Sequence, residues 1–372
     1  MKSVKLFSFS SIFFLIFISC SPKDLIKETS LKNSYKENFL IGTALNIGQI
    51  NETVSVKEKQ LLLREFNSIT PENIMKSMFI HPAKDTFYFD MADKFVAFGE
   101  KNNMHIQGHT LIWHSQLAPW FYQIKDSLEM VEVMTNHINT IVGKYKGKIN
   151  AWDVVNEALN DDGTMRKSVF LDALGEDFMT LAFKLAEKAD PNVELYYNDY
   201  SMTNPQKREG AIRMIKRMQA NGAKVDGIGM QAHMGLNGPT IEEFEKSIIA
   251  YSALGIKVAF TEVDVNVLPN PWDFQGADVS VKFEERPGTN PYVNGLPDSI
   301  QTKLTKRYKD VFELLLKHQE KISRVTLWGA HDGQSWKNNW PVQGRTDYPL
   351  LFDRNFDPKP AYNAVMALKE EK

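Results

Sequence analysis

The chain has 372 residues, of which 43% are hydrophobic and 24% are charged, and its formal net charge is −2. This composition is typical of a globular protein with a large core and is too polar for a protein with many membrane spans. Because there is no basic surplus, we expect no nucleic acid partner.

The N-terminus carries the pattern of an export signal. Lys2 and Lys5 precede an apolar run over residues 12–18, and the run is too short for a transmembrane helix. We therefore predict that residues 1–19 form a secretory signal peptide and that the protein is exported.

Cys20 follows this signal and is the only cysteine of the chain, so no disulfide can account for it. Ser19 and Cys20 resemble a bacterial lipoprotein cleavage site, with Phe17 where Leu is more usual. The resemblance implies lipid attachment at Cys20 and a membrane anchor, on the periplasmic or cell-surface side of an outer membrane. An ordinary cleaved signal with an incidental cysteine is the alternative. Residues 20–36 are polar, and we expect a tether.

After the tether, short apolar runs alternate with longer stretches of helical period, as in a parallel sheet wrapped by helices. Eight such units predict an α/β fold, a single (β/α)₈ TIM barrel over residues 37–372. The expected strands are residues 39–46, 68–72, 104–110, 149–156, 194–200, 227–233, 257–263 and 324–330. The main expected helices are residues 90–102, 126–145, 178–189, 204–221, 240–254 and 300–319, and Gly222 and Gly255 stand where a helix end favours a left-handed residue.

Residues 269–297 interrupt this alternation with five prolines and no clear period. A connection of this length is usually functional. Because it follows the seventh strand, we expect it at the C-terminal face of the barrel, beside any active site there.

Two carboxylates stand at the ends of apolar, β-rich runs: Glu157 after WDVVN and Glu262 within VAFTEVD. A carboxylate is not buried in such a place without a partner, because desolvating the ion costs several kcal/mol. We interpret the two as a pair that the fold brings together, which is the minimum equipment for hydrolysing a glycosidic bond. A structural acid paired with Arg or Lys is the alternative for Glu157.

The predicted strand ends are crowded with polar and aromatic side chains, and in barrel enzymes catalytic groups project from these ends. The set comprises Glu72, Asn73, Lys76, His109, Trp113, Asn156, Asn198, Asp199, Tyr200, Gln231, His233, Asp264, Trp328, His331, Asp332 and Trp336. A barrel that needed only stability would not gather so many hydrogen-bonding groups at one rim.

Five strings among these strand ends resemble the signatures of family 10 glycoside hydrolases, the retaining endo-β-1,4-xylanases. They are GHTLIWH (108–114), WDVVNE (152–157), GMQAH (229–233), TEVD (261–264) and WGAHDG (328–333), in this order. The resemblance implies a barrel with its acid/base, Glu157, after strand four and its nucleophile, Glu262, after strand seven. It implies xylan or xylo-oligosaccharides as substrate and no cofactor.

The two carboxylates need opposite properties. Glu157 would protonate the leaving oxygen and later deprotonate water, so its pKa must be raised. Glu262 must stay ionised and therefore needs hydrogen-bond donors, which we expect to be Asn156 and His233. The resemblance also implies a chain from Glu262 through His233 to Asp264.

The resemblance implies further contacts with sugars. Glu72, Asn73 and Lys76 would bind on the non-reducing side, although an ordinary helix N-cap with solvated charges is the alternative. His109 and Gln231 would bind hydroxyl groups, and Trp113, Trp328 and Trp336 would stack on sugar rings, with Tyr200 as a weaker candidate. Trp336 and Gln116 would crowd the space of a hydroxymethyl group and favour xylose over glucose. We expect Trp152 to be core packing.

Three alternatives differ from this hypothesis. Four histidines (His109, His114, His233 and His331) could suggest a metal site, but their spacing matches no metalloprotease motif, so we expect none. A β-1,4-glucanase of the same fold is the second, and a surface lipoprotein that binds polysaccharide without cutting it is the third. We expect a monomer.

Overall fold

The structure is a computed structural model that describes Met1, residues 29–270 and residues 281–370. Most of the predicted signal peptide, residues 1–19, and the predicted lipidation site Cys20 lie outside these residues. In the described part of the chain, every helix is too short or too polar to cross a membrane.

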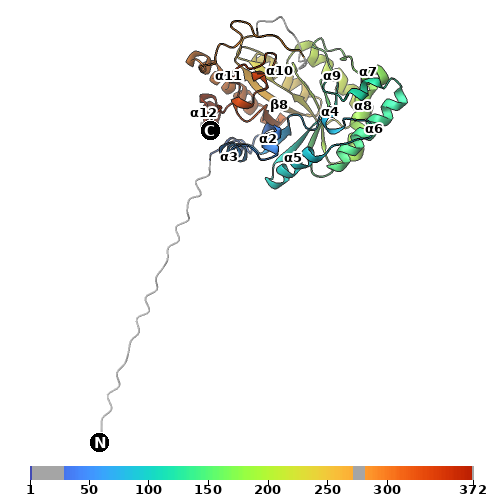
Figure 1. Cartoon of the computed structure of the whole chain (residues 1–372), viewed down its shortest axis with the longest axis horizontal. Coiled ribbons are helices and arrows are strands. Elements are labelled where there is room, and N and C mark those ends of the chain that lie inside the picture. The colour runs from blue at the N-terminus through green and yellow to red at the C-terminus, as the bar shows by residue number, and fades with distance from the viewer. Residues whose placement is uncertain (2–28, 271–280, 371–372) are drawn as a thin grey trace.

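The described residues form a closed barrel of parallel strands surrounded by helices, which confirms the predicted (β/α)₈ architecture (Figure 1). Neighbouring strands follow the chain order, and pairing of β6 with β8 and of β1 with β9 closes the ring. The strands are β1 (Leu40–Leu45), β2 (Ser68–Pro71), β3 (His105–Trp113), β4 (Ala151–Asn156), β5 (Glu194–Asp199), β6 (Gly227–Met230), β7 (His233–Gly235), β8 (Lys257–Asn266) and β9 (Ile322–Leu327).

The sixth predicted strand is divided in two. β6 ends at Met230, and Ala232 has a φ of +60°, a left-handed conformation that ends regular pairing. The chain resumes as β7, in which His233 lies opposite Asp264 of β8. This break places Gln231 and His233 at the rim of the barrel.

The helices pack their apolar sides against the barrel, and many begin where the sequence offers a capping side chain. Ser55, Asp126, Asn204 and Thr240 each accept a hydrogen bond from the backbone of the helix that they precede. The helices are α1 (Leu31–Ser34), α2 (Ile47–Ile50), α3 (Val56–Glu65), α4 (Ser77–Ile80), α5 (Asp90–Lys101), α6 (Ser127–Lys144), α7 (Val169–Leu174), α8 (Asp177–Ala189), α9 (Pro205–Ala220), α10 (Ile241–Ser252), α11 (Asp298–Lys317) and α12 (Pro360–Ala367). Short 3₁₀ turns span Pro119–Gln123, Gln319–Lys321, Asp332–Gln334 and Trp336–Asn338.

The two predicted glycine stops after helices are confirmed. Gly222 has a φ of +77° beyond the end of α9, and Gly255 has a φ of +76° beyond the end of α10. A side chain at either position would be strained in this conformation, whereas glycine adopts it freely.

The predicted tether extends too far, because residues 30–36 belong to the barrel domain. Leu31 and Tyr35 are fully buried, and the ring of Tyr35 stacks on Phe39 with 5.3 Å between centroids. The Tyr35 hydroxyl donates to the carbonyl of Val365 in α12 at 2.6 Å. The folded domain thus begins near residue 30. The two apolar side chains, one helical turn apart, outweigh the polar composition of the segment.

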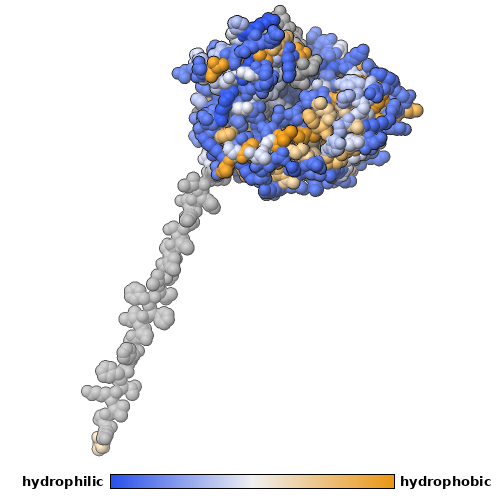
Figure 2. All heavy atoms as spheres, viewed as in Figure 1, coloured by the Kyte–Doolittle hydropathy of each residue, from blue (hydrophilic) through white to orange (hydrophobic). Residues whose placement is uncertain are grey.

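The long connection after β8 lies against the segment that follows β9. The backbone of Phe283 donates to the carbonyl of Pro341 at 2.9 Å, and the Tyr348 hydroxyl donates to the carbonyl of Tyr292 at 2.9 Å. Residues 271–280 of this connection lie outside the described residues. The face drawn in Figure 2 is mainly hydrophilic, with apolar side chains gathered in a limited band.

Candidate active site

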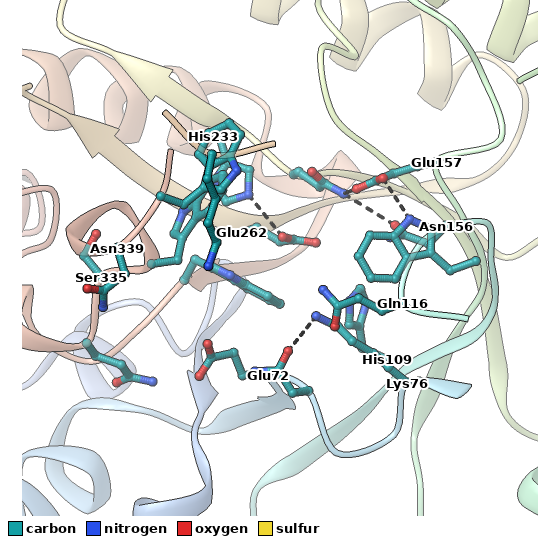
Figure 3. Close-up of a pocket in the computed structure, with 18 of the residues that line it drawn as sticks. Glu72, Lys76, His109, Gln116, Asn156, Glu157, His233, Glu262, Ser335 and Asn339 are labelled. Atoms are coloured by element: carbon teal, nitrogen blue, oxygen red, sulfur yellow. Dashed lines mark hydrogen bonds and ion pairs between the residues drawn. The ribbon is translucent and has the colours of Figure 1, made fainter. Parts of the chain in front are cut away.

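A cleft of about 380 Å³ lies at the C-terminal ends of the strands, and Glu157 and Glu262 both line it. In Figure 3 the two carboxylates reach toward the same space from different strands, with Glu72 on the opposite side of Glu262 from His233. The sequence-predicted residues that line this cleft are Glu72, Asn73, Lys76, His109, Trp113, Gln116, Asn156, Glu157, Gln231, His233, Glu262, Trp328 and Trp336. Lys282 of the long connection also lines it, which places that connection beside the site as expected.

Glu157 is positioned by an unusual backbone conformation directly after β4. Its φ is +56°, in the left-handed region that costs a non-glycine residue about 1–3 kcal/mol. The backbone N–H of Glu157 donates to the carbonyl of Asn198 at 2.8 Å, which holds the turn in place. One carboxylate oxygen accepts from Trp113 Nε1 and the other from Gln231 Nε2, both at 2.8 Å (Figure 3).

The surroundings of Glu157 favour its protonated form. Burial raises the pKa of the Glu157 carboxyl, and the negative charge of Asp199 raises it further. The hydrogen bonds from Gln231 and Trp113 act in the opposite direction but do not reverse the shift. A carboxyl group with a raised pKa can donate a proton near neutral pH.

Glu262 lies within β8 and is surrounded by donors. Its Oε2 is 3.1 Å from His233 Nε2, and its Oε1 accepts from Asn198 Nδ2 at 3.0 Å. Burial alone would raise the pKa of Glu262, but the hydrogen bond and positive charge of His233 outweigh it and lower the pKa. Glu262 is therefore held as a carboxylate, the form that a nucleophile requires.

His233 stands between two carboxylates. Its Nδ1 is 2.9 Å from Asp264 Oδ2, and that same oxygen accepts from Trp336 Nε1 at 2.8 Å. Burial opposes protonation of His233, but Asp264 and Glu262 together raise its pKa to about 9. The imidazolium is thus fixed in orientation and carries the charge that stabilises ionised Glu262.

The predicted second donor to Glu262 is wrong: the structure provides Asn198 in place of Asn156. The side chain of Asn156 lies 3.0 Å from Asn198 Nδ2 and lines the cleft without contacting Glu262. Thr261 Oγ1 donates to Asn198 Oδ1 at 2.6 Å and fixes the direction of the amide. Asn198 stood among the polar strand ends of the sequence, but no pattern there indicates which amide would face Glu262.

A buried ion pair behind Glu157 also escaped the sequence analysis. Asp199 and Lys207 are fully buried, with Lys207 Nζ 2.8 Å from Asp199 Oδ1. Tyr197 donates its hydroxyl proton to Asp199 and accepts from the backbone N–H of Ala158 at 3.1 Å. Lys207 lies in the first turn of α9, and lysine is seldom fully buried unless it is paired.

Glu72, Asn73 and Lys76 form a polar group at the far side of the cleft. Lys76 occupies the N-cap position of α4 but makes no capping bond; its Nζ donates to Asn73 Oδ1 at 2.8 Å and lies 5.0 Å from the centroid of the Trp113 ring. Burial raises the pKa of Glu72 and lowers that of Lys76. Lys76 is buried, Glu72 and Asn73 are partly buried, and all three line the cleft, so they are not the solvated charges of an ordinary helix N-cap.

His109 and Trp152 differ in their roles. His109 Nδ1 lies 2.9 Å from Asp153 Oδ2, so a buried carboxylate sets the orientation of the imidazole at the cleft. Trp152 is 1% exposed and belongs to the core, as predicted.

Three other predicted groups lie outside the catalytic cleft. Tyr200 lines an adjoining cavity, where Lys207 Nζ lies 3.7 Å from its ring centroid. His331 lies 3.5 Å from Glu58 Oε1, and His114 is absent from the cleft lining. Across the described residues, no three His, Cys, Asp or Glu side chains converge as metal ligands would.

The sequence matches the model of a family described as Glycosyl hydrolase family 10 over residues 30–368. It is 44% identical to an endo-1,4-beta-xylanase A of Xylanibacter ruminicola, covering 92% of this chain and 94% of that protein, and 39% identical to a beta-1,4-xylanase of Dictyoglomus thermophilum, covering 90% and 89%. Among solved structures, a GH10 endoxylanase from a sugarcane soil metagenome superposes with a TM-score of 0.87 at 45% identity, covering 91% of this chain and 99% of that one. The xylanase XynB of Paenibacillus barcinonensis, solved with a conduramine derivative, gives 0.82 at 33% identity, covering 92% and 99%.

Proposed function

The chain belongs to glycosyl hydrolase family 10, and from this premise we propose that it is an endo-1,4-β-xylanase that cleaves internal bonds of xylan with retention of configuration. The observation that carries the proposal is the pair of carboxyl groups in one cleft, Glu157 with a raised pKa and Glu262 with a lowered one. Retention requires one proton donor and one ionised nucleophile, and this pair supplies both.

In the first step, a carboxylate oxygen of Glu262 attacks the anomeric carbon of the sugar at the cleavage point. The bond to the glycosidic oxygen breaks, and Glu157 gives its proton to that oxygen as the leaving sugar departs. The products are a covalent ester between the sugar and Glu262 and an ionised Glu157. His233 keeps Glu262 ionised and aimed before attack, since its Nε2 is only 3.1 Å away.

In the second step, the ionised Glu157 removes a proton from water, and the water oxygen attacks the same anomeric carbon. The ester bond breaks, Glu262 returns as a carboxylate, and Glu157 is again protonated. Gln231 donates to Glu157 from the strand end nearest His233, so this amide can hold the catalytic acid in place through both steps.

The preference for xylose over glucose rests on the walls of the cleft. Trp336 and Gln116 both line it and would occupy the space that a hydroxymethyl group needs. A β-1,4-glucanase would need room there, so initial rates on xylan and on carboxymethylcellulose should differ strongly in favour of xylan. Equal rates would favour the glucanase.

The decisive test of activity is release of reducing sugar from soluble xylan by the purified protein, with product lengths measured over time. An endo-acting enzyme releases oligosaccharides of many lengths from the first minutes, and their mean length decreases with time. Tight binding of xylan without any product would instead identify a polysaccharide-binding protein and contradict the proposal.

We further propose that the protein is an exported lipoprotein acylated at Cys20. The support is the sequence: an apolar signal precedes a sole cysteine, and a polar segment follows it. Acyl chains contribute about 0.8 kcal/mol for each buried methylene. The wild type should enter the detergent phase in a detergent-partition assay and a Cys20→Ala variant the aqueous phase. If the wild type and Cys20→Ala partition identically, the proposed lipid anchor at Cys20 is contradicted.

We also propose that the domain acts as a monomer, because each carboxylate of the site receives its partners from within one chain. Light scattering on the purified domain should give the mass of a single chain, and a concentration-independent dimer would contradict this.

A further inference from the structure

A second cavity, of about 480 Å³, continues the catalytic cleft on the side away from Glu72. The two share His233, Trp336 and Trp340 as common walls. Most of the remaining walls of the second cavity come from the connection between β5 and α9 and from the start of α10, and Met230, Ala232 and Lys337 complete them. A chain of sugars that lies across Glu157 and Glu262 and extends away from Glu72 would enter this cavity.

Lys337 lines the second cavity on an aromatic surface. Its Nζ lies 3.9 Å from the ring centroid of Trp336 and 4.3 Å from that of Trp340, and the two indoles stack with 4.8 Å between centroids. The side chain is partly buried. Within residues 29–270 and 281–370, no carboxylate lies at ion-pair distance from this ammonium group. Lys337 is therefore a cation that stays next to the substrate path without an acidic contact.

Asp264 and Asp347 affect the pKa of Lys337 through their charges, but neither forms an ion pair with it. Their carboxylate oxygens accept hydrogen bonds from other groups. Asp264 accepts from His233 and Trp336, and Asp347 accepts from the backbone N–H of Tyr348 at 2.8 Å. Glu243, the acid that lines the second cavity, contacts Arg208 at 3.1 Å and Lys246 at 2.5 Å.

Partial burial also removes water from Lys337. Burial lowers its pKa to about 8, against the opposing charges of Asp264 and Asp347. The group is still mainly protonated at pH 7 and has lost part of its hydration. A desolvated ammonium gains more from a new anionic partner than a fully hydrated one does.

We propose that Lys337 binds the carboxylate of an acidic substituent on the xylan chain, a uronate carried by a sugar in the second cavity. The proposal rests on the xylanase activity proposed above and assigns that site a preference for acidic xylan. The ammonium can donate up to three hydrogen bonds to the carboxylate, while the flat faces of Trp336 and Trp340 offer a surface for the sugar ring. A neutral substituent could pack on the tryptophans but could not form the ion pair with Lys337.

The test compares two forms of one substrate: a uronate-bearing xylan, and the same preparation after its carboxyl groups have been reduced to alcohols. We would measure kcat/KM on both for the wild type, Lys337→Gln and Lys337→Arg. Lys309→Gln is the matched control, because Lys309 lies on α11 beside Glu313, away from both cavities. The informative quantity is the ratio of kcat/KM on the charged form to that on the reduced form.

Lys337→Gln should lower this ratio about two- to fivefold, the range of one partly exposed ion pair, whereas Lys337→Arg and Lys309→Gln should keep it close to the wild-type value. High salt should lower the wild-type ratio and leave that of Lys337→Gln unaltered. An equal loss on both substrates, with an unchanged ratio, would show that Lys337 only supports the tryptophans and would overturn the proposal. Failure of the wild type to hydrolyse either form would overturn both this proposal and the xylanase assignment.

Discussion

Strands β4 and β8 each position a carboxyl group at the cleft, in surroundings that shift its pKa in opposite directions. At the end of β4, Glu157 has neutral donors and a negative neighbour, Asp199. Within β8, Glu262 lies next to the imidazolium of His233, whose other ring nitrogen contacts Asp264. Both carboxylates are nearly fully buried, so burial does not distinguish them; the charge of the nearest group does.

The opposite pKa shifts of Glu157 and Glu262 indicate which carboxyl group acts as the acid and which as the nucleophile. A buried carboxyl that is disfavoured as an anion serves as an acid, and one that is stabilised as an anion serves as a nucleophile. The apolar runs before Glu157 and Glu262 look alike in the sequence, so the assignment comes from residues on other strands. The following variants change one side of the comparison at a time.

The largest expected effect comes from Glu262→Ala, which removes the attacking group. We expect kcat on xylan to fall on the order of 10⁵-fold, since little of the covalent route survives without its nucleophile. Added azide should restore cleavage of an activated aryl xyloside and give the azide product of inverted configuration. Rescue with retained configuration would place the nucleophile elsewhere.

Glu157→Ala should give a smaller and more selective loss. Without a proton donor, kcat on xylan should fall about 10²–10⁴-fold. An aryl glycoside with a good leaving group should still form the intermediate rapidly, because that group departs unprotonated. Pre-steady-state release of the aryl group measures this step. If the variant hydrolysed xylan at the wild-type rate, Glu157 would not be the general acid/base.

The third test weakens the charge beside Glu262. His233→Gln should raise the pKa of Glu262, because it removes the hydrogen bond and the positive charge that lower it. The acidic limb of the kcat/KM profile should move to higher pH, since Glu262 must be ionised to attack. The alkaline limb, which reports Glu157, should move much less. If both limbs keep their wild-type positions, the imidazole is not what keeps Glu262 ionised.

The smallest effect is expected from Asp199→Asn, on the other side of the comparison. The negative charge of Asp199 raises the pKa of Glu157, so its removal should lower that pKa and move the alkaline limb to lower pH. Asp177→Asn, on the exposed start of α8, is the matched control and should leave the profile in place. An unmoved alkaline limb in Asp199→Asn would mean that Asp199 carries no charge in the folded enzyme.

The barrel and the two carboxylates were predictable because their signals are local. Alternating apolar runs indicate strands and helices, and strand ends share one rim in a parallel barrel. The donor to Glu262 was not predictable, because Asn156 and Asn198 both lie near the ends of apolar strands, and the orientation of Asn198 depends on a bond from Thr261 of another strand. The burial of Lys207 was not predictable for the same reason: its partner, Asp199, lies on another element, so the sequence around Lys207 does not indicate the ion pair.

The error at the N-terminus has a different cause. Residues 30–36 contain too few apolar side chains for a composition-based prediction of packing, yet Tyr35 alone contacts Phe39, Phe312 and Val365. One aromatic side chain that is fully buried can contribute about 3–5 kcal/mol relative to Ala. A short polar segment is therefore held by two buried side chains, Leu31 and Tyr35, which are too few to give a clear apolar period.

The proposed mechanism depends most on Glu262 as the residue that bonds to the sugar. The direct measurement is mass spectrometry of peptides after incubation with an activated 2-deoxy-2-fluoro xylobioside, whose fluorine slows hydrolysis of the intermediate. We predict a fluoro-xylobiosyl label on the peptide that contains Glu262, and no label in Glu262→Ala. A label on another carboxylate, or turnover of the reagent with inversion and no label, would contradict it.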